Sequence, residues 1–257
     1  MHADPASIRS LKGQVTAEEW AARTDLAAAY RAVAMFGWDD LVFTHISARV
    51  PGRERHFLIN PYGMMFEEIT ASSLVKVDLE ARKVIDSPFE VNPAGFTIHS
   101  AVHEARDDAH CVIHLHTTEG VAVSCQKAGL LAISQQSLIP FTGLAYHDYE
   151  GIAINPEEKG RLVNDLGGRN FMILRNHGLL ACAESVADAF LYMYILQKAC
   201  EVQVRAQAGG AELVPIAQPI VDGIRAASAV VLRQSGGMIA WPGLKRRLDR
   251  RDPSWRE

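Results

Sequence analysis

Cys111-Val112-Ile113-His114-Leu115-His116 is the segment of this sequence that says most about its architecture. The apolar start is typical of a short buried strand, and the polar end predicts that the strand stops at the last histidine. Side chains two residues apart on an extended strand point to the same side. His114 and His116 are therefore expected to present two imidazole rings on one face, where both could bind one metal ion.

A third histidine, His177, lies in the turn Arg175-Asn176-His177-Gly178 between two further predicted strands, residues 171–174 and 179–182. Gly178 allows a sharp turn and leaves no side chain beside the imidazole. A histidine in such a turn can also be structural. Since no cluster of Cys or Asp competes with them, His114, His116 and His177 are the best metal-binding set that the sequence offers.

Helical signals surround these strands. The sequence Thr16-Ala17-Glu18-Glu19 is a capping box that predicts a helix running to about Phe36 and ending at Gly37. Ser185 is the expected cap of a long helix that reaches about residue 208. The remaining patterns predict helices over 96–105, 119–127, from 155 onward and over 220–234, and strands over 42–50, 55–59, 75–78, 111–116 and 130–133. This mixture of strands and helices predicts a layered α/β domain.

The chain of 257 residues is 48% hydrophobic, which is enough for the core of one large α/β domain. We expect an arm over residues 1–15, the domain over 16–240, and a tail over 241–257. Because exposed Trp241 and Trp255 would be unfavourable, the tail is expected to pack on the domain or on a neighbouring subunit.

The composition also limits the partners. A net charge of -4 gives no reason to expect a nucleic acid or an anionic membrane. There is no apolar run long enough to span a bilayer and no signal-peptide pattern at the start. The four cysteines lie far apart in apolar segments and are expected to be reduced core residues. These features predict a cytoplasmic protein that binds a small molecule.

Several motifs, in the same order, resemble the class II aldolase and adducin family. They are residues 92–101, 111–118, 145–152 and 174–179, and residues 59–63 and 69–79 resemble the adducin head branch in particular. The resemblance covers about residues 20–210. It implies a three-layer α/β/α subunit of the class II aldolase (AraD-like) fold with a central mixed or antiparallel sheet. It also implies a homotetramer with active sites at the subunit boundaries.

The resemblance further implies a divalent ion, usually zinc, at the positions of His114, His116 and His177. Three imidazoles also suit manganese or iron, and they leave positions on the ion open for water or substrate. In the aldolases that this sequence resembles, the ion is a Lewis acid that polarises a carbonyl group during cleavage of a carbon–carbon bond.

The sequence departs from the family pattern at the acid–base position. The family segment that carries a glutamate aligns with Pro93-Ala94-Gly95, so Gly95 stands at the glutamate position, and the phosphate loop is matched by residues 44–47. Ordinary sugar-phosphate aldolase activity is therefore not expected. Three residues are candidates for the missing acid or base: Glu119, His45 and Tyr146, the last with its neighbour His147.

Each candidate has a structural alternative. Glu119 could be a helix-start acid favoured by the helix dipole, and Tyr146 could pack at a subunit interface. His99 is interpreted as a packed residue near the site, whereas His103, His110 and His56 are expected at the surface.

These observations favour a metal-dependent lyase of the aldolase or decarboxylase type, acting on a small oxygen-rich carbonyl or hydroxy-acid compound. One alternative is an oxygen-activating non-haem iron enzyme with the same three ligands. Another is a non-catalytic binding module of the adducin type, with a role in the cytoskeleton. The presence of all three histidines favours an enzyme, because a scaffold has no evident need for them.

Overall fold

The computed structural model describes residues 8–153, 155, 157–233 and 236–257. Within these ranges, the strands form one sheet in the order β3-β2-β1-β4-β7-β6-β5. All neighbouring strands are antiparallel except β5 and β6, which are parallel, so the sheet is mixed as expected. The strands are β1 (His45–Arg49), β2 (Phe57–Ile59), β3 (Val75–Val77), β4 (Cys111–Leu115), β5 (Leu144–His147), β6 (Phe171–Leu174) and β7 (Gly178–Ala183).

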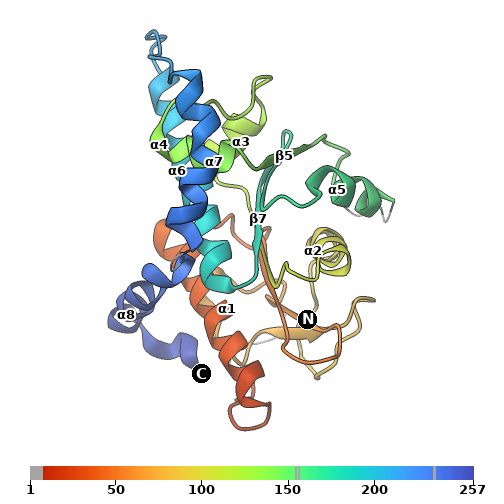
Figure 1. Ribbon diagram of the computed structural model, residues 1–257. Coiled ribbons are helices and arrows are strands. Elements are labelled where there is room, and N and C mark those ends of the chain that lie inside the picture. Colours follow the sequence, from red (N-terminus) through yellow and green to blue (C-terminus); the bar gives the residue numbers. More distant parts are fainter. Residues whose placement is uncertain (1–7, 154, 156, 234–235) are drawn as a thin grey trace.

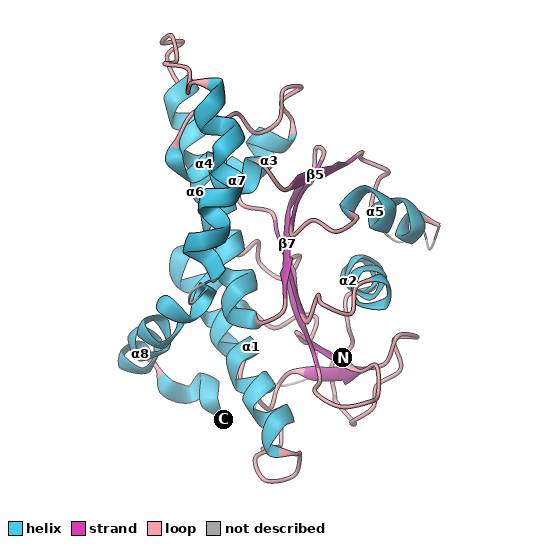
Figure 2. Cartoon of the chain, in the orientation of Figure 1, coloured by secondary structure: helices cyan, strands magenta, loops and turns pink. Residues whose placement is uncertain are grey.

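Helices cover both faces of this sheet, which gives the predicted three layers (Figure 1; Figure 2). One face carries α1 (Ala17–Phe36), α3 (Thr118–Ser124), α4 (Gln135–Phe141), α6 (Val186–Gln207) and α7 (Gln218–Arg233). The other face carries α2 (Pro93–Ala105) and α5 (Glu158–Leu166), and α8 (Trp241–Arg251) lies outside α1. Among the described helices, none is both long and apolar enough to cross a membrane.

The core consists of two apolar clusters, one on each side of the sheet, and β4 contributes to both. Ile113 and Leu115 pack in the cluster that includes α1 and α6, whereas Val112 packs in the cluster that includes α2 and α5. Because side chains alternate along a strand, His114 and His116 continue the side of Val112. The sheet thus turns both histidines toward the α2 and α5 layer.

Thr16 caps α1 as predicted, but Glu19 does not complete the predicted capping box. Thr16 accepts a hydrogen bond from the backbone N–H of Glu19, and Gly37 ends the helix in the left-handed conformation, with φ of 68°. The Glu19 carboxylate does not return to the cap, however. It accepts hydrogen bonds from Arg23 and Lys76 at 2.9 Å and 2.8 Å, because both cations lie beside this buried carboxylate.

Two neighbouring regions were assigned incorrectly from the sequence. Residues 130–133 form no strand, because side chains take their backbone donors: the N–H of Leu130 donates to the Tyr146 hydroxyl and that of Leu131 to Gln203. The strand at this edge of the sheet, beside β6, is β5, which the apolar pattern did not identify, and α4 was not expected either. Cys125 is exposed, whereas the other three cysteines are buried as predicted.

The last segment folds back on the domain. It consists of α8 and a 3₁₀ turn, Pro253–Arg256. The Trp241 indole donates to Asp25 of α1, and Trp255 is fully buried, with its backbone carbonyl accepting from Ala71. Residues 1–7 of the expected arm lie outside the described residues, as do Pro156 and Gln234 of two expected helices.

Candidate metal centre

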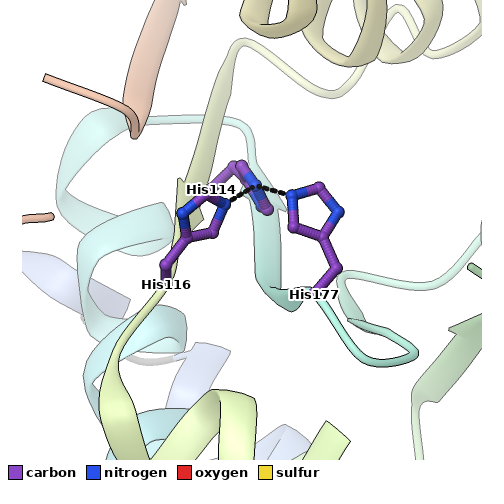
Figure 3. Close-up of side chains that lie close together, drawn as sticks. All are labelled: His114, His116 and His177. Carbon is purple, nitrogen blue, oxygen red and sulfur yellow. Dashed lines mark hydrogen bonds between the residues drawn. The ribbon is translucent and has the colours of Figure 1, made fainter. Parts of the chain in front are cut away.

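Three histidines from two distant segments meet at one end of the sheet (Figure 3). His114 lies in β4, His116 directly follows it, and His177 lies in the turn that joins β6 to β7, the strand that pairs with β4. The Nε2 atom of His114 is 3.0 Å from Nε2 of His116 and 3.3 Å from Nε2 of His177. One nitrogen from each of the three rings lies within 4.8 Å of the others.

The opposite edge of two of these rings is held by groups that only accept hydrogen bonds. Nδ1 of His114 is 3.0 Å from the backbone carbonyl of Leu179, and Nδ1 of His116 is 3.0 Å from the carboxylate of Asp40. Each Nδ1 must therefore carry a hydrogen, which in a neutral ring leaves an unshared electron pair on Nε2. Such partners on the far nitrogen are typical of histidines that bind a metal.

Unshared pairs at 3.0 Å from each other are unfavourable unless a cation lies between them. Tetrahedral ligands at zinc–nitrogen distances of 2.0–2.1 Å are separated by about 3.3 Å, close to the spacing of these nitrogens. Burial first, and then the neighbouring His177 and His116, hold the pKa of His114 well below its usual value. Burial and then His116 lower the pKa of His177 to about 4. His114 and His177 are thus in the neutral form that a divalent ion requires, and the three residues fit such an ion.

The turn that carries His177 depends on its two neighbours. Asn176 adopts the left-handed conformation, with φ of 55°, which asparagine tolerates better than most residues. A methyl group built on Gly178 would lie 2.5 Å from the backbone oxygen of Leu115 and 3.1 Å from the His116 ring. Glycine is therefore required for close approach of the turn to β4.

The three histidines line a cavity of about 620 Å³. Polar groups that share this cavity are His45, Asp40, Tyr62, Asn92, Tyr149 and Asn176. None of the described lining residues is a lysine or an arginine. The cavity can therefore admit a small molecule, and it offers oxygen and nitrogen acceptors without a fixed positive side chain.

His45 is the sequence-predicted candidate that the fold brings to this cavity. It is the register partner of His114 across β1 and β4, and the two rings stack with centroids 5.1 Å apart. A methyl group built on Gly95 would lie 2.7 Å from Cγ and 2.8 Å from Nε2 of His45. The imidazole therefore fills the space that any side chain at position 95 would need.

The other candidates lie elsewhere in this chain. The Glu119 carboxylate accepts a hydrogen bond from Gln197 of α6, at 3.1 Å. The Tyr146 hydroxyl accepts from the backbone of Leu130, and the guanidinium of Arg175 covers its ring at 4.1 Å. His147 is buried beside Asp165. None of these three candidates lines the cavity formed by the described residues.

Several residues at or near the site were not found from the sequence. Asp40 shares no spacing with the histidines that would have indicated its contact with His116. Tyr149 lies in a motif that the sequence did single out, but Tyr146 was preferred within it. The expectation that His103 lies at the surface is wrong: it is 1% exposed, because its spacing of four residues from His99 places both on the face of α2 that meets the sheet.

The sequence is similar to that of known proteins over its whole length. Residues 24–204 match the family described as "Class II Aldolase and Adducin N-terminal domain". A Pseudomonas aeruginosa protein, provisionally named a class 2 aldolase, is 60% identical over all of this chain and 99% of its own length. Mouse alpha-adducin is 48% identical over 203 residues, which are 77% of this chain and 27% of adducin.

Solved structures give the same result. An aldolase II superfamily protein from Pseudomonas syringae superimposes with a TM-score of 0.93 at 46% identity, covering 97% of this chain and 100% of that one. An L-fuculose 1-phosphate aldolase from Glaciozyma antarctica superimposes with a TM-score of 0.79 at 27% identity, covering 99% and 97%. The predicted fold is therefore confirmed.

Proposed function

Because this chain belongs to the class II aldolase and adducin family, we propose that it is a divalent-metal-dependent lyase of the aldolase or decarboxylase type. Its substrate is a small oxygen-rich carbonyl or hydroxy-acid compound. The observation that carries the proposal is the convergence of three Nε2 atoms in an open cavity, with the hydrogens of two rings held on their opposite edges.

His114, His116 and His177 would hold the ion, with zinc the first choice and manganese or iron possible from the same ligands. When bound, the ion supplies a Lewis acid that stabilises negative charge developing on a carbonyl oxygen. The chain contributes the fixed orientation of the rings: the Leu179 carbonyl and the Asp40 carboxylate prevent them from turning away.

His45 is the proposed proton acceptor. Burial, followed by the nearby His116 and His177, lowers its pKa to about 3, so the imidazole is neutral at pH 7 and can accept a hydrogen bond. It fills the space above Gly95, where the family pattern has a glutamate. A substrate hydroxyl placed between the ion and His45 would donate to this imidazole. Since Glu119 and Tyr146 lie outside the cavity of this chain, His45 is the base that we favour.

The cavity favours a substrate without a phosphate group. Ser47, in the segment that matches the family phosphate loop, is fully buried and bonded to His99 and His103. Pro93, Ala94 and Gly95 offer no side-chain hydroxyl, and no described lining residue is a lysine or an arginine. A compound with two adjacent oxygens, such as a 2-oxo acid, could instead be oriented by the ion itself.

We also infer a cytoplasmic homotetramer whose subunits meet near this cavity. Phe43, Tyr149 and Ile152 line the cavity and are exposed by 49%, 55% and 73%. Apolar side chains grouped at one opening are typical of a surface that a partner covers. Sedimentation of wild type and of Ile152→Asp tests this: the variant should dissociate, whereas a monomeric wild type would contradict the inference.

A binding module of the adducin type is the second candidate, favoured by the 48% identity to mouse alpha-adducin. The two functions differ in their need for metal. A lyase loses its activity when the ion is removed, whereas a binding surface elsewhere on the fold would retain its partner. Binding to filamentous actin that persists in wild type and in a metal-free variant would favour the module.

Metal analysis tests the lyase proposal most directly. Wild type purified without added metal should contain about one divalent ion per chain, and His114→Ala/His116→Ala should contain almost none. The double variant His56→Ala/His110→Ala removes two histidines outside the site and should keep the ion. Screening 2-oxo acids and hydroxybenzoates for released carbon dioxide or aldehyde then identifies the substrate class. Equal metal content in wild type and the first variant would refute the site.

A further inference from the structure

Behind His45 lies a line of buried polar side chains that the proposed metal centre does not use. We propose that His99, Ser47 and His103 form a hydrogen-bonded chain that fixes His45 in one tautomer and presents its Nε2 electron pair to a substrate hydroxyl. This proposal rests on the proposed function for its catalytic meaning, but its structural content can be tested without it. The three residues are positioning residues, and only His45 meets the substrate.

The chain is continuous from the cavity to the end of α2. Nδ1 of His45 is 2.9 Å from Nε2 of His99, and Nδ1 of His99 is 2.5 Å from the Ser47 hydroxyl. That hydroxyl is 2.7 Å from Nε2 of His103, whose Nδ1 is 2.9 Å from the backbone carbonyl of Ala109. All four side chains are at most 2% exposed, so water does not compete for these contacts.

The carbonyl of Ala109 sets the direction of every bond. A carbonyl only accepts, so Nδ1 of His103 carries a hydrogen and its Nε2 accepts from the Ser47 hydroxyl. Since that hydroxyl has a single hydrogen, it must accept from Nδ1 of His99. Nε2 of His99 is then an acceptor, and it takes the hydrogen on Nδ1 of His45. The Nε2 of His45 is left with an unshared pair.

The opposite direction is excluded by the same groups. It would place the unshared pair of His103 Nδ1 against the Ala109 carbonyl oxygen, or it would require a charged imidazolium in the core. Arg49, which donates to the His103 carbonyl, already places a positive charge nearby. Burial and that charge lower the pKa of His103 to about 3, and burial holds the pKa of His99 well below its usual value.

The open end of the chain points to the proposed substrate. No described residue is hydrogen-bonded to Nε2 of His45, and His45 lines the cavity beside His114. Gly95 has no side chain against this ring, and a methyl group there would lie 2.8 Å from Nε2. The far end stops at a carbonyl, which cannot pass a proton onward. The chain therefore holds a tautomer and is not a path for protons to solvent.

Nuclear magnetic resonance of protein with ¹⁵N-labelled histidine tests the tautomers directly. In zinc-loaded wild type, His45, His99 and His103 should each carry their hydrogen on Nδ1. In Ser47→Ala, His99 loses its acceptor and can donate from Nε2 instead, so the His45 signals should shift toward the Nε2–H form. Ser47→Thr retains a hydroxyl and should restore the wild-type signals.

Ser100→Ala is the matched control, since Ser100 is also buried and donates only to the Thr97 carbonyl of its own helix. It should leave the tautomer of His45 unchanged. With a substrate in hand, Ser47→Ala should lower kcat by about ten-fold at unchanged zinc content, as part of the contribution of a positioned base. Ser100→Ala should not change kcat.

Two results would overturn the proposal: an Nε2–H tautomer of His45 in wild type, or an unchanged His45 tautomer in Ser47→Ala. The wild-type spectrum decides the first point even if the variant fails to fold. A wild type with the expected tautomers but no metal would refute the proposed function and leave the hydrogen-bonded chain intact.

Discussion

Two groups of three histidines lie side by side in this protein, and they differ in where their hydrogens are. In the first group, His114, His116 and His177, the Nε2 atoms converge, and acceptors on the far edge hold the hydrogens of His114 and His116 on Nδ1. In the second group, His45, His99 and His103, one hydrogen lies in each contact. These contacts are His45 with His99, and Ser47 with His99 and with His103. The first group is arranged so that it could hold a cation, whereas hydrogen bonds join the members of the second group to one another.

The comparison shows that proximity of histidines does not by itself indicate a metal site. What distinguishes the groups is the partner on the remaining nitrogen and the presence of Ser47, whose single hydroxyl hydrogen completes the second group. Substitutions in either group test this difference.

Loss of a ligand should have the largest effect. His177→Ala should lower zinc affinity by more than about 100-fold, which exceeds the loss of affinity expected when a residue that only orients a ligand is removed. The stability of the metal-free chain should change little. His103→Ala should do the reverse: it should retain zinc and lose about 2–4 kcal/mol of unfolding free energy, because it leaves a cavity and an unpaired hydroxyl. Zinc titration and urea unfolding in chelator measure both. Loss of zinc in His103→Ala, with zinc retained in His177→Ala, would contradict the distinction between the two groups.

The fit between Gly95 and His45 should give the next effect. Gly95→Ala places a methyl group against the imidazole and should destabilise the fold by about 1–3 kcal/mol. In a His45→Ala background the same change should cost less than about 0.5 kcal/mol, and a double-mutant cycle of urea unfolding measures the coupling. Gly160→Ala on α5, where nothing lies within 4 Å, is the control and should be neutral or stabilising. Additive costs would disprove the overlap.

Asp40 should affect the metal and not the fold. Asp40→Ala removes the acceptor for Nδ1 of His116, so zinc affinity should fall by about 10–100-fold. The half-exposed side chain makes a large change in stability unexpected. Competition with a zinc-binding dye measures the affinity, with Asp39→Ala as the neighbouring control. Equal affinities in both variants would show that Asp40 does not support His116.

The buried neutral state of His103, in the second group, should make the free energy of unfolding depend on pH. Between pH 6.5, the ordinary pKa, and about 3, its folded value, His103 is protonated only in the unfolded chain. The free energy of unfolding should therefore fall by about 1.4 kcal/mol per pH unit as the pH drops below 6.5, for this residue alone. Glutamine cannot be protonated, so His103→Gln should lack the part of this pH dependence that His103 contributes. Urea unfolding at several pH values, in chelator, compares them; parallel curves would contradict the buried neutral state.

The candidate metal set could be found from the sequence because its signals are local. The His-x-His pair closes an apolar strand, His177 lies in a turn between two others, and caps at Thr16, Gly37 and Ser185 placed the two long helices. Apolar run and turn chemistry are properties of a few adjacent residues. Residues 130–133 show the limit, since an apolar run alone could not show that side chains would take its backbone donors.

The second group could only be decided by the tertiary structure. The register of β1 against β4 pairs His45 with His114, and α2 lays His99 and His103 across Ser47. No spacing in the sequence links position 45 to position 99, because both the register and the helix position are set by packing between segments that are distant along the chain. The sequence alone predicted the family, the layers and three candidate ligands; the hydrogen-bond partners of each buried ring were set by packing, since only the fold brings those partners together.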